Sequence, residues 1–313
     1  MNAIRPDSLD TFIGQTQARS ILRILINASR KRHEPLPHLL FISGFPGLGK
    51  TTLSRILAGE MGGSLIEVVG AGIRDTDEMV SILQELKPMD CLFLDEIHAI
   101  PRAVEEILYG AMEDRVVNVV DRGFDTLMKS IGMGSGSGGK KARKTVTLPP
   151  FCLIGATTTQ GELSSPLRSR FQQTISLVPY TCDELATIII NASHKLSFQL
   201  PPDIAQEIAR RSRSTARLAL GNLVFYRDFV QGSDLQVNQE SIQACFQLKG
   251  VDSDGLMERD RQYLRALQGG QAVGLETLSA CLNESVETIT DSVEPYLFQL
   301  GRVRKTARGR VLV

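Results

Sequence analysis

The residues of this 313-residue chain that are best suited to chemistry begin with a glycine-rich segment at 44–51, GFPGLGKT. The segment fits the pattern G-x-x-x-x-G-K-[ST] and stands between an apolar run and a helical stretch. Glycines let backbone N–H groups surround phosphate oxygens, and the helix that follows adds the positive end of its dipole. The segment predicts a nucleotide site in which Lys50 reaches the β- and γ-phosphates and Thr51 binds Mg²⁺.

Two adjacent carboxylates, Asp95 and Glu96, end an apolar run that starts at Cys91. Aspartate at this place can hold Mg²⁺ through water, and glutamate can polarise the attacking water. Adjacent acids at the end of a strand are common by themselves, but downstream of a phosphate loop they indicate a hydrolytic pair. Because Glu96 is intact, the sequence favours an ATP-hydrolysing enzyme over a protein that only binds and releases nucleotide.

Two further groups could respond to the terminal phosphate. Thr157 and Thr158 end the apolar strand candidate 151–159, where a hydroxyl can sense the γ-phosphate. The ordinary preference of threonine for strands is the alternative. Arg217 begins a predicted helix and could contact the nucleotide from a lid, although a solvated arginine stays open as an explanation.

A pair of arginines follows in the segment LSSPLRSRF at 163–171. Arg168 and Arg170 lie two residues apart on a short helix or turn, from which they can reach a neighbouring subunit. An arginine that acts in trans on a γ-phosphate raises the hydrolysis rate by several orders of magnitude. Alone, the pair would be explained by exposed salt bridges, but its place after the other motifs predicts an arginine finger.

The chain ends in a basic segment, RVRKTARGRVLV. Five cations fall within nine residues, with no acid among them: Arg302, Arg304, Lys305, Arg308 and Arg310. Helical patterns at 256–268, 274–283 and 285–301 precede this segment. Three helices and a basic hairpin predict a winged helix that contacts DNA phosphates or the minor groove, with a solvated tail as the alternative.

The elements that must position these residues alternate through the first half of the chain. Strand-like apolar runs occupy 38–43, 64–69, 91–97, 151–159 and 174–180. Helical patterns occupy 50–61, 75–86 and 102–114. This alternation predicts a parallel sheet with crossover helices, and the helical patterns after Tyr180 predict a small all-α domain.

The segment between Arg115 and Leu148 interrupts this alternation of strands and helices. β-prone pieces at 115–120 and 144–148 flank the stretch MGSGSGGKKARK at 133–144. Glycine, serine and clustered charge cannot bury enough apolar surface to order that stretch. We expect an extended β-hairpin with a mobile basic tip, and an unstructured surface loop is the alternative for the tip.

Composition limits the remaining possibilities. Lys plus Arg and Asp plus Glu both number 35, so any nucleic-acid binding must come from a local basic patch. Five cysteines without metal-type spacing indicate reduced, buried thiols in a cytosolic protein. Apolar runs are too short for a membrane span and the N-terminus lacks a signal region, so we expect a cytoplasmic protein.

In this order the motifs resemble the RuvB family of AAA+ motors, which drive Holliday-junction branch migration. The likeness runs from RPDSLDTFIGQ (5–15) to RGRV (308–311) and includes FLDEIH and LPPFCLIGATT, which are far more specific than a general P-loop. It implies ATP- and Mg²⁺-dependent translocation of double-stranded DNA by a homo-hexamer, in recombination and repair. It also implies a RuvA-like partner at the hairpin.

The resemblance assigns domains and residues by position. The expected domains are an α/β P-loop AAA+ domain at 1–180 with the hairpin at 115–148, an all-α lid at 181–250 and a winged helix at 251–313. The adenine pocket would contain Arg5, Pro6, Ile13 and Tyr180. The phosphate loop would contribute Gly47, Leu48, Gly49, Lys50, Thr51 and Thr52, and Mg²⁺ would be held by Thr51 and Asp95. The remaining roles would fall to Glu96 as hydrolytic base, Thr158 as first sensor, Arg170 as trans-acting finger and Arg217 as second sensor. Arg308 and Arg310 match the family's winged-helix DNA contacts.

The chain departs from the family pattern at a few places. The usual Gly-Pro-Pro-Gly reads GFPG at 44–47, and the usual Gly-Thr-Pro-Arg reads STAR at 214–217. The hairpin is lengthened by its Gly/Ser/Lys insert. Every catalytic position survives, but the altered hairpin leaves the partner open. A RuvB-like motor with a different partner and a protein-remodelling or clamp-loader-type ATPase stay as alternatives.

Overall fold

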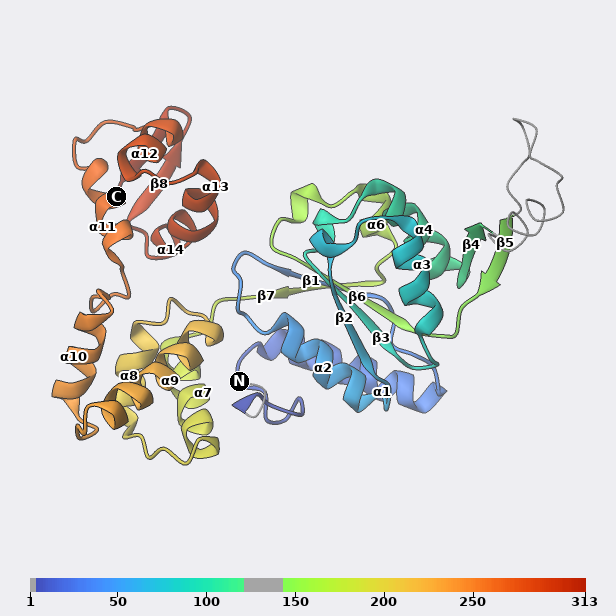
Figure 1. The fold of residues 1–313 in the computed structure, drawn as a ribbon, viewed down its shortest axis with the longest axis horizontal. Helices are drawn as coiled ribbons and strands as arrows, with labels where there is room; N and C mark the ends of the chain where they lie inside the picture. Colours follow the sequence, from blue (N-terminus) through green and yellow to red (C-terminus); the bar gives the residue numbers. More distant parts are fainter. Residues whose placement is uncertain (1–3, 121–142) are drawn as a thin grey trace, which may run out of the picture. The chain divides into compact units, whose positions relative to one another are not determined.

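The computed structural model describes residues 4–120 and 143–313 (Figure 1). Its contacts divide the chain into two compact units. The sheet unit comprises Pro6–Ser43 and Lys50–Leu177. The C-terminal unit comprises Gly44–Gly49 and Val178–Val313, together with the N-terminal residues up to Arg5. By its contacts, the phosphate loop at 44–49 is grouped with the C-terminal unit.

The sheet unit is built on a five-stranded parallel sheet in the order β2-β3-β6-β1-β7. The strands are β1 (Leu39–Ser43), β2 (Leu65–Val69), β3 (Cys91–Asp95), β6 (Cys152–Thr157) and β7 (Gln173–Leu177). Every residue of β6 is buried, because neighbouring strands and helices cover it on all sides. Burial on both faces explains why the central strands read as continuous apolar runs rather than alternating ones.

Helices cover both faces of this sheet (Figure 1). On one face lie α1 (Thr16–Arg32) and α2 (Lys50–Glu60), and on the other lie α3 (Thr76–Glu85), α4 (Arg102–Glu113) and α6 (Ser165–Ser169). Short 3₁₀ turns occupy Gly70–Gly72, Ile97–Ala99 and Gln160–Glu162. The fold class predicted from the sequence is confirmed, but helix α1 was not predicted.

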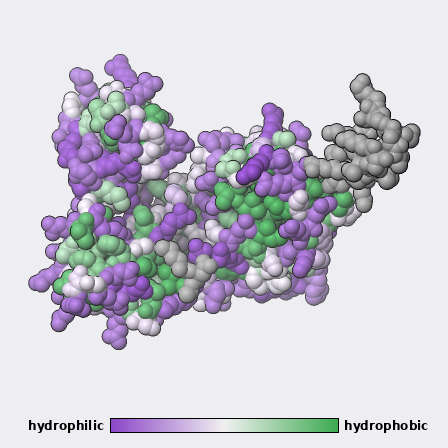
Figure 2. All heavy atoms as spheres, viewed as in Figure 1, coloured by the Kyte–Doolittle hydropathy of each residue, from purple (hydrophilic) through white to green (hydrophobic). Residues whose placement is uncertain are grey.

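The hairpin stem consists of β4 (Val116–Val120) and β5 (Arg143–Thr147), which pair antiparallel. The root of this stem belongs to the core of the sheet unit, because Val117 and Leu148 are buried there. The expected mobile basic tip lies outside the described residues. Half-buried Ile82, Ile107 and Val146 pack against the same core. Figure 2 shows apolar surface gathered over α3, α4 and the hairpin stem.

The first part of the C-terminal unit is the helical lid predicted from the sequence. Its helices are α7 (Cys182–Lys195), α8 (Pro202–Arg210), α9 (Ala216–Gly232) and α10 (Gln239–Leu248). Reciprocal hydrogen bonds of a capping box start α7 at Thr181 and Glu184, which explains the sharp change from strand to helix. The fully buried Tyr226 anchors α9 in the lid core.

The winged helix follows, with α11 (Glu258–Ala266), α12 (Leu275–Leu282), and the strands β8 (Val303–Thr306) and β9 (Gly309–Leu312). The third helix expected at 285–301 extends without interruption over residues 286–299, as α13 (Val286–Thr288), a π-helical segment at Ile289–Val293 and α14 (Glu294–Gln299). Pro295 in the first turn of α14 accounts for the π-helical segment before it, because proline has no N–H for the helical ladder and its ring crowds the preceding turn. The domain has its own apolar core, which includes the fully buried Tyr263.

The five cysteines are free thiols. Cys91, Cys152 and Cys245 are buried, and burial raises the pKa of the Cys245 thiol to about 11. Cys182 is half-buried, but Cys281 is exposed on α12, so the expectation of a buried thiol was wrong for it. Among the described residues, no helix combines the length and apolar character that a membrane span requires.

Candidate nucleotide site and DNA-binding surface

The carboxyl ends of three neighbouring strands bring the candidate residues of the sheet unit to one edge. Strand β6 lies between β1 and β3, and all three run parallel. Ser43, Asp95 and Thr157 end these strands. Ligands of open parallel sheets bind outside this edge, because the loops that follow the strands gather there.

Lys50 starts α2 directly after the phosphate loop. Its side chain is buried, with 8% of the residue exposed, and its Nζ donates a 2.8 Å hydrogen bond to Ser43 Oγ. The half-buried Thr51 and Thr52 follow in the first turn of the helix. A cation, two hydroxyls and the amide groups of a helix start are thus held together where β1 ends, which suits phosphate oxygens.

The acidic pair stands at the end of β3. Asp95 is half-buried, and its Oδ1 accepts a 3.2 Å hydrogen bond from the Glu96 N–H. Glu96 is exposed and adopts a left-handed backbone (φ 52°) before the turn at Ile97–Ala99. Gly70 lies against this turn, since a Cβ there would be 2.4 Å from the Glu96 carbonyl oxygen. Gly70 therefore permits the turn that presents Glu96 to solvent, a role that the sequence analysis did not find.

Thr157 and Thr158 differ in environment. Thr157 is buried, and its hydroxyl lies 3.0 Å from His98 Nδ1 and accepts a hydrogen bond from the Thr159 N–H. Thr158 is exposed just beyond the strand. The Glu162 carboxylate accepts a hydrogen bond from the Thr159 hydroxyl and lies 3.9 Å from His98 Nε2. His98 thus connects the turn after Glu96 to the end of β6, another role that the motif search overlooked.

Arg170 follows α6 and contacts α4. Its Nη2 donates a 3.3 Å hydrogen bond to Glu113 Oε2, its Nε lies 3.2 Å from Oε1 of the same carboxylate, and its Nη1 donates to the Pro166 carbonyl at 2.7 Å. The guanidinium lies over the Tyr109 ring, 4.1 Å from the centroid. Arg168 is exposed. Because Glu113 is itself largely exposed, a competing anion could take Arg170 from it at small cost.

The phosphate loop, described within the C-terminal unit, packs against the start of α9. Gly47 and Gly49 have positive φ, and a Cβ at Gly47 would meet the Cβ of Arg217 at 2.8 Å and that of Thr215 at 3.6 Å. Only glycine fits at position 47 without displacing α9. Arg217 is exposed in the first turn of the helix. The predicted second sensor therefore stands beside the phosphate loop.

Tyr180 connects the same loop to the lid. Its ring is buried, its hydroxyl donates a 3.1 Å hydrogen bond to the Leu48 carbonyl, and its N–H donates to the Ser214 carbonyl. Arg5 is half-buried, and its carbonyl accepts a hydrogen bond from Lys195. Pro6 and Ile13, the other expected adenine contacts, belong to the sheet unit and are half-buried there.

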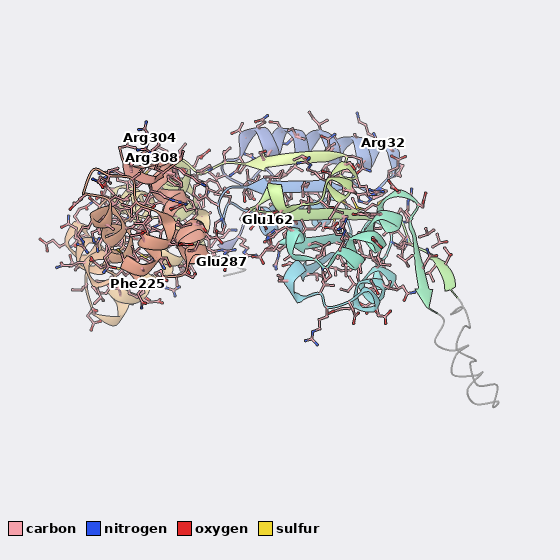
Figure 3. The ribbon with its side chains drawn as sticks, turned by 90° about the horizontal axis from the view of Figure 1, so that it is seen from above. Arg32, Glu162, Phe225, Glu287, Arg304 and Arg308 are labelled. Carbon is pink, nitrogen blue, oxygen red and sulfur yellow. The ribbon has the colours of Figure 1, made fainter. Side chains whose placement is uncertain are left out.

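The basic hairpin of the winged helix presents most of its cations to solvent. Arg302, Arg304, Lys305 and Arg308 are exposed. Arg308 lies in the tight turn between β8 and β9, and Figure 3 shows it with Arg304 at the outer surface of the domain. Arg302 donates a 2.8 Å hydrogen bond to the exposed Asp254 carboxylate. An exposed hairpin of this charge suits phosphate contacts.

Arg310 does not belong to this surface. It is 8% exposed, its Nε donates to Glu294 Oε1 at 2.7 Å, and its Nη2 lies 3.2 Å from Oε2 of the same carboxylate. The Tyr263 hydroxyl donates a third hydrogen bond to Glu294. The hydrogen bonds to Glu294 raise the pKa of the Arg310 guanidinium. The expectation that Arg310 contacts DNA is therefore corrected, because its side chain neutralises a buried carboxylate.

The donor set of the sheet unit fits a nucleotide with Mg²⁺. Magnesium prefers hydroxyl, carboxylate and phosphate oxygens and is usually held by one or two protein groups. Thr51 and Asp95 are oxygen donors of this kind, and Lys50 supplies a cation that the nearby Ser43 hydroxyl holds in place. Bound Mg²⁺ would neutralise charge on the phosphates, while Glu96 would hold and orient the attacking water.

Comparison with protein families covers the chain almost without gaps. The family model described as "Holliday junction DNA helicase RuvB P-loop domain" matches residues 4–177. The models of the RuvB AAA lid domain and of the RuvB C-terminal winged helix domain match residues 180–252 and 253–313. The three matches follow the sheet, the helical lid and the winged helix, and the P-loop model also includes the phosphate loop at 44–49.

Individual relatives agree with these matches. The Holliday junction branch migration complex subunit RuvB of Paramagnetospirillum magneticum is 42% identical, over 99% of this chain and 86% of the relative. That of Campylobacter hominis is 40% identical, over 99% of this chain and 88% of the relative. The solved structure of the Thermotoga maritima RuvB Holliday junction branch migration motor is 36% identical with a TM-score of 0.83, covering 99% of this chain and 96% of that one. Given the fold, the site and these matches, the chain belongs to the RuvB family of Holliday-junction branch-migration ATPases.

Proposed function

We propose that this protein is an ATP-driven translocase that moves double-stranded DNA through a homo-hexameric ring and so promotes branch migration of Holliday junctions in recombination and repair. The observation that carries the proposal is the exposed Glu96, held beside Asp95 at the sheet edge where Lys50 and Thr157 also lie. An intact water-activating carboxylate favours turnover over mere binding of nucleotide. The matches to RuvB over the whole chain name the process that turnover serves.

In the proposed site, Lys50 contacts the β- and γ-phosphates, and Thr51 and Asp95 hold Mg²⁺. Glu96 orients the attacking water, and Thr158 contacts the γ-phosphate. The burial of Thr157 supports the choice of Thr158, because the Thr157 hydroxyl is engaged by His98 and Thr159 whereas Thr158 is exposed. Phosphoryl transfer needs mainly positioning and charge stabilisation, and these residues supply both.

Nucleotide contacts from the C-terminal unit complete the proposal. Gly47, Leu48 and Gly49 would bind phosphates through backbone N–H groups, and Arg217 would contact the γ-phosphate from the start of α9. The close approach of Gly47 to Arg217 supports this role. Arg5, Pro6, Ile13 and Tyr180 would form the adenine pocket, although Tyr180 also has a structural part through its bond to Leu48.

Arg170 would act on the site of a neighbouring subunit. In the isolated chain it is held by Glu113 and Tyr109 at the surface of the sheet unit. The γ-phosphate of a neighbour carries more charge than one exposed carboxylate and would displace that partner. This arrangement keeps basal hydrolysis low until subunits assemble, because an arginine finger contributes several orders of magnitude to the rate.

The proposed partners are duplex DNA and a RuvA-like junction-binding protein. Arg302, Arg304, Lys305 and Arg308 would contact DNA phosphates. The hairpin would carry the partner site, and the half-buried Ile82, Ile107 and Val146 near its root supply apolar surface of the kind that protein interfaces use. A partly apolar surface at the root of the hairpin favours a protein partner over DNA as its binding partner.

We also propose the division into an AAA+ domain (1–180), a lid (181–250) and a winged helix (251–313). The separate apolar core of the winged helix supports its independence. The process acts on chromosomal DNA, so the proposed location is the cytoplasm. A protein-remodelling or clamp-loader-type role is disfavoured by the four exposed cations on the wing, since a protein-binding winged helix has no need of them.

Steady-state ATP turnover with linear duplex, with a four-way junction and without DNA tests the proposal. We expect either DNA to raise turnover, and Glu96→Gln protein to bind ATP but turn it over about a hundredfold more slowly. Glu96→Gln is a conservative test of this role, since it keeps the size and shape of the side chain but removes the negative charge and one acceptor oxygen. Turnover that is unaffected by any DNA would count against a DNA motor.

A further inference from the structure

The segment 213–217 comprises the end of the loop between α8 and α9 and the first two residues of α9, and it contacts both the phosphate loop and the winged helix. Residues 213–217 belong wholly to the C-terminal unit, as do the phosphate loop and the winged helix. At one end, Thr215 and Arg217 lie against Gly47. The Ser214 carbonyl accepts the N–H of Tyr180, whose hydroxyl in turn binds the Leu48 carbonyl.

At the other end, the same loop contacts the winged helix through the Arg213 side chain. Its Nε donates a 3.0 Å hydrogen bond to the Gly255 carbonyl, and its Nη1 lies 3.4 Å from the Ser292 carbonyl. Its Nη2 forms an ion pair with Asp260. The guanidinium also lies over the Tyr296 ring, 5.1 Å from the centroid. One side chain therefore joins three separate segments of the winged helix.

Burial makes this ion pair unlike the surface pairs of the chain. The Arg213 side chain is 10% exposed and that of Asp260 is 0% exposed. Asp260 also accepts the Met257 N–H at 2.7 Å, which starts α11. An adjacent bond from Gln299 Nε2 to Ser214 Oγ, 2.8 Å long, ties α14 to the same loop. A buried charge pair specifies one geometry, because any other leaves a charge without a partner.

The backbone conformation of the loop also indicates that its position is fixed by surrounding contacts. Arg213 (φ 46°) and Ser214 (φ 53°) are consecutive non-glycine residues in the left-handed region. Such a pair is uncommon and persists only where surrounding contacts impose it. Here those contacts come from the winged helix on the Arg213 side chain and from Tyr180 on the Ser214 carbonyl.

We propose that Arg213 and Ser214 form a coupling loop that transmits movement of the phosphate loop and Arg217 to the winged helix. Arg213 is a positioning residue in this proposal and does not touch nucleotide or DNA. The proposal rests on the proposed function, because it names how nucleotide turnover becomes movement of the DNA-binding domain. The buried Arg213–Asp260 pair makes the lid and the winged helix move as one body. A displacement of the lid at Gly47 is therefore transmitted to the winged helix in full.

The test compares variants of the full-length protein by junction migration per ATP hydrolysed. Arg213→Met combined with Asp260→Asn removes both charges together, so no buried charge is stranded, and the side-chain carbonyl of the new asparagine can still accept the Met257 N–H. We expect unchanged basal turnover and junction affinity, but about a tenfold loss of migration per ATP, within the usual range of coupling between sites. Arg213→Lys should recover part of the loss, because lysine can pair with Asp260 but cannot also reach the carbonyls. The matched control is Arg259→Ala, which breaks a pair with Glu284 inside the winged helix.

A distance measurement separates this inference from the function on which it rests. One spin label is placed on the exposed Cys281 of the winged helix and a second on a Gln231→Cys lid variant, with Cys182→Ser to remove the half-buried thiol. The two labels report the distance between the lid and the winged helix. We expect one narrow distance in wild type with ADP and with a non-hydrolysable ATP analogue, and a broad one in the Arg213/Asp260 double variant. Equal widths, equal migration per ATP, or a parallel fall of basal turnover and affinity would overturn the coupling loop. Wild-type protein that hydrolyses ATP but moves no junction would instead overturn the proposed function, and the distances would still decide the inference.

Discussion

Replacing Arg310 should damage the winged helix itself rather than its affinity for DNA. Glu294 is 3% exposed, and Arg310→Ala leaves its carboxylate with Tyr263 as the one side-chain donor that the structure describes for it. Breaking a buried ion pair by removing one partner costs about 3–5 kcal/mol. Domains as small as this one lie at the low end of the usual ~5–15 kcal/mol of stability, so much of the domain should unfold.

The comparison with Arg308→Ala gives this prediction its control. Arg308 is exposed in the wing turn, so its loss should change stability by less than about 0.5 kcal/mol. If it contacts one phosphate, the slope of log affinity against log salt should fall by roughly 0.9. Urea unfolding of both variants, followed by DNA titration at several salt concentrations, separates the two effects.

A compensating variant tests the cause of the damage. Replacing Arg310 and Glu294 together by leucine removes both charges, and such exchanges are often neutral or stabilising. The double variant should therefore recover stability that Arg310→Ala loses. An Arg310→Ala protein that unfolds like wild type and loses the same salt slope as Arg308→Ala would refute the reasoning and return Arg310 to the DNA surface.

Three further predictions concern assembly, the hairpin and the thiols. Arg170→Ala should bind ATP normally yet hydrolyse it poorly, and mixing it with Lys50→Ala protein should restore activity at mixed interfaces; no recovery in confirmed mixed rings would contradict action in trans. Deleting residues 121–144 and closing the stem should leave basal ATP turnover near wild type, because the root at Val117 and Leu148 stays in place, and should abolish partner-stimulated junction migration. Unaffected migration would remove the hairpin's role. A thiol reagent should label Cys281 first and Cys245 last, because Cys281 is exposed and burial raises the pKa of Cys245 to about 11; mass spectrometry of the labelled peptides decides the order.

The sequence was informative where local chemistry decides structure. The phosphate loop, the strand that ends at Asp95 and the buried strand β6 carry motifs or continuous apolar runs, and each was located within a few residues. Helix α1 was not predicted because its apolar and polar residues do not separate cleanly onto two faces. Its buried face includes the polar Ser29, while Ile24 is 67% exposed on the opposite side.

Tertiary packing decided what the sequence could not. Clustered charge in the last residues suggested five equivalent cations, but Glu294, distant in sequence, takes Arg310 into the core. The role of His98 depends on Thr157 of another strand, and that of Gly70 on the turn at Glu96. None of these partners is visible in spacing along the chain, because long-range contacts leave no periodic pattern.

The most direct test of the account is the dissociation of a synthetic four-way junction in the presence of a RuvA-like partner. Wild-type protein with ATP should convert the junction to duplex products. Glu96→Gln protein should bind the junction with wild-type affinity and leave it intact. Migration by the Glu96→Gln variant at the wild-type rate, or none by the wild type while it hydrolyses ATP, would contradict the claim that hydrolysis at this site moves DNA.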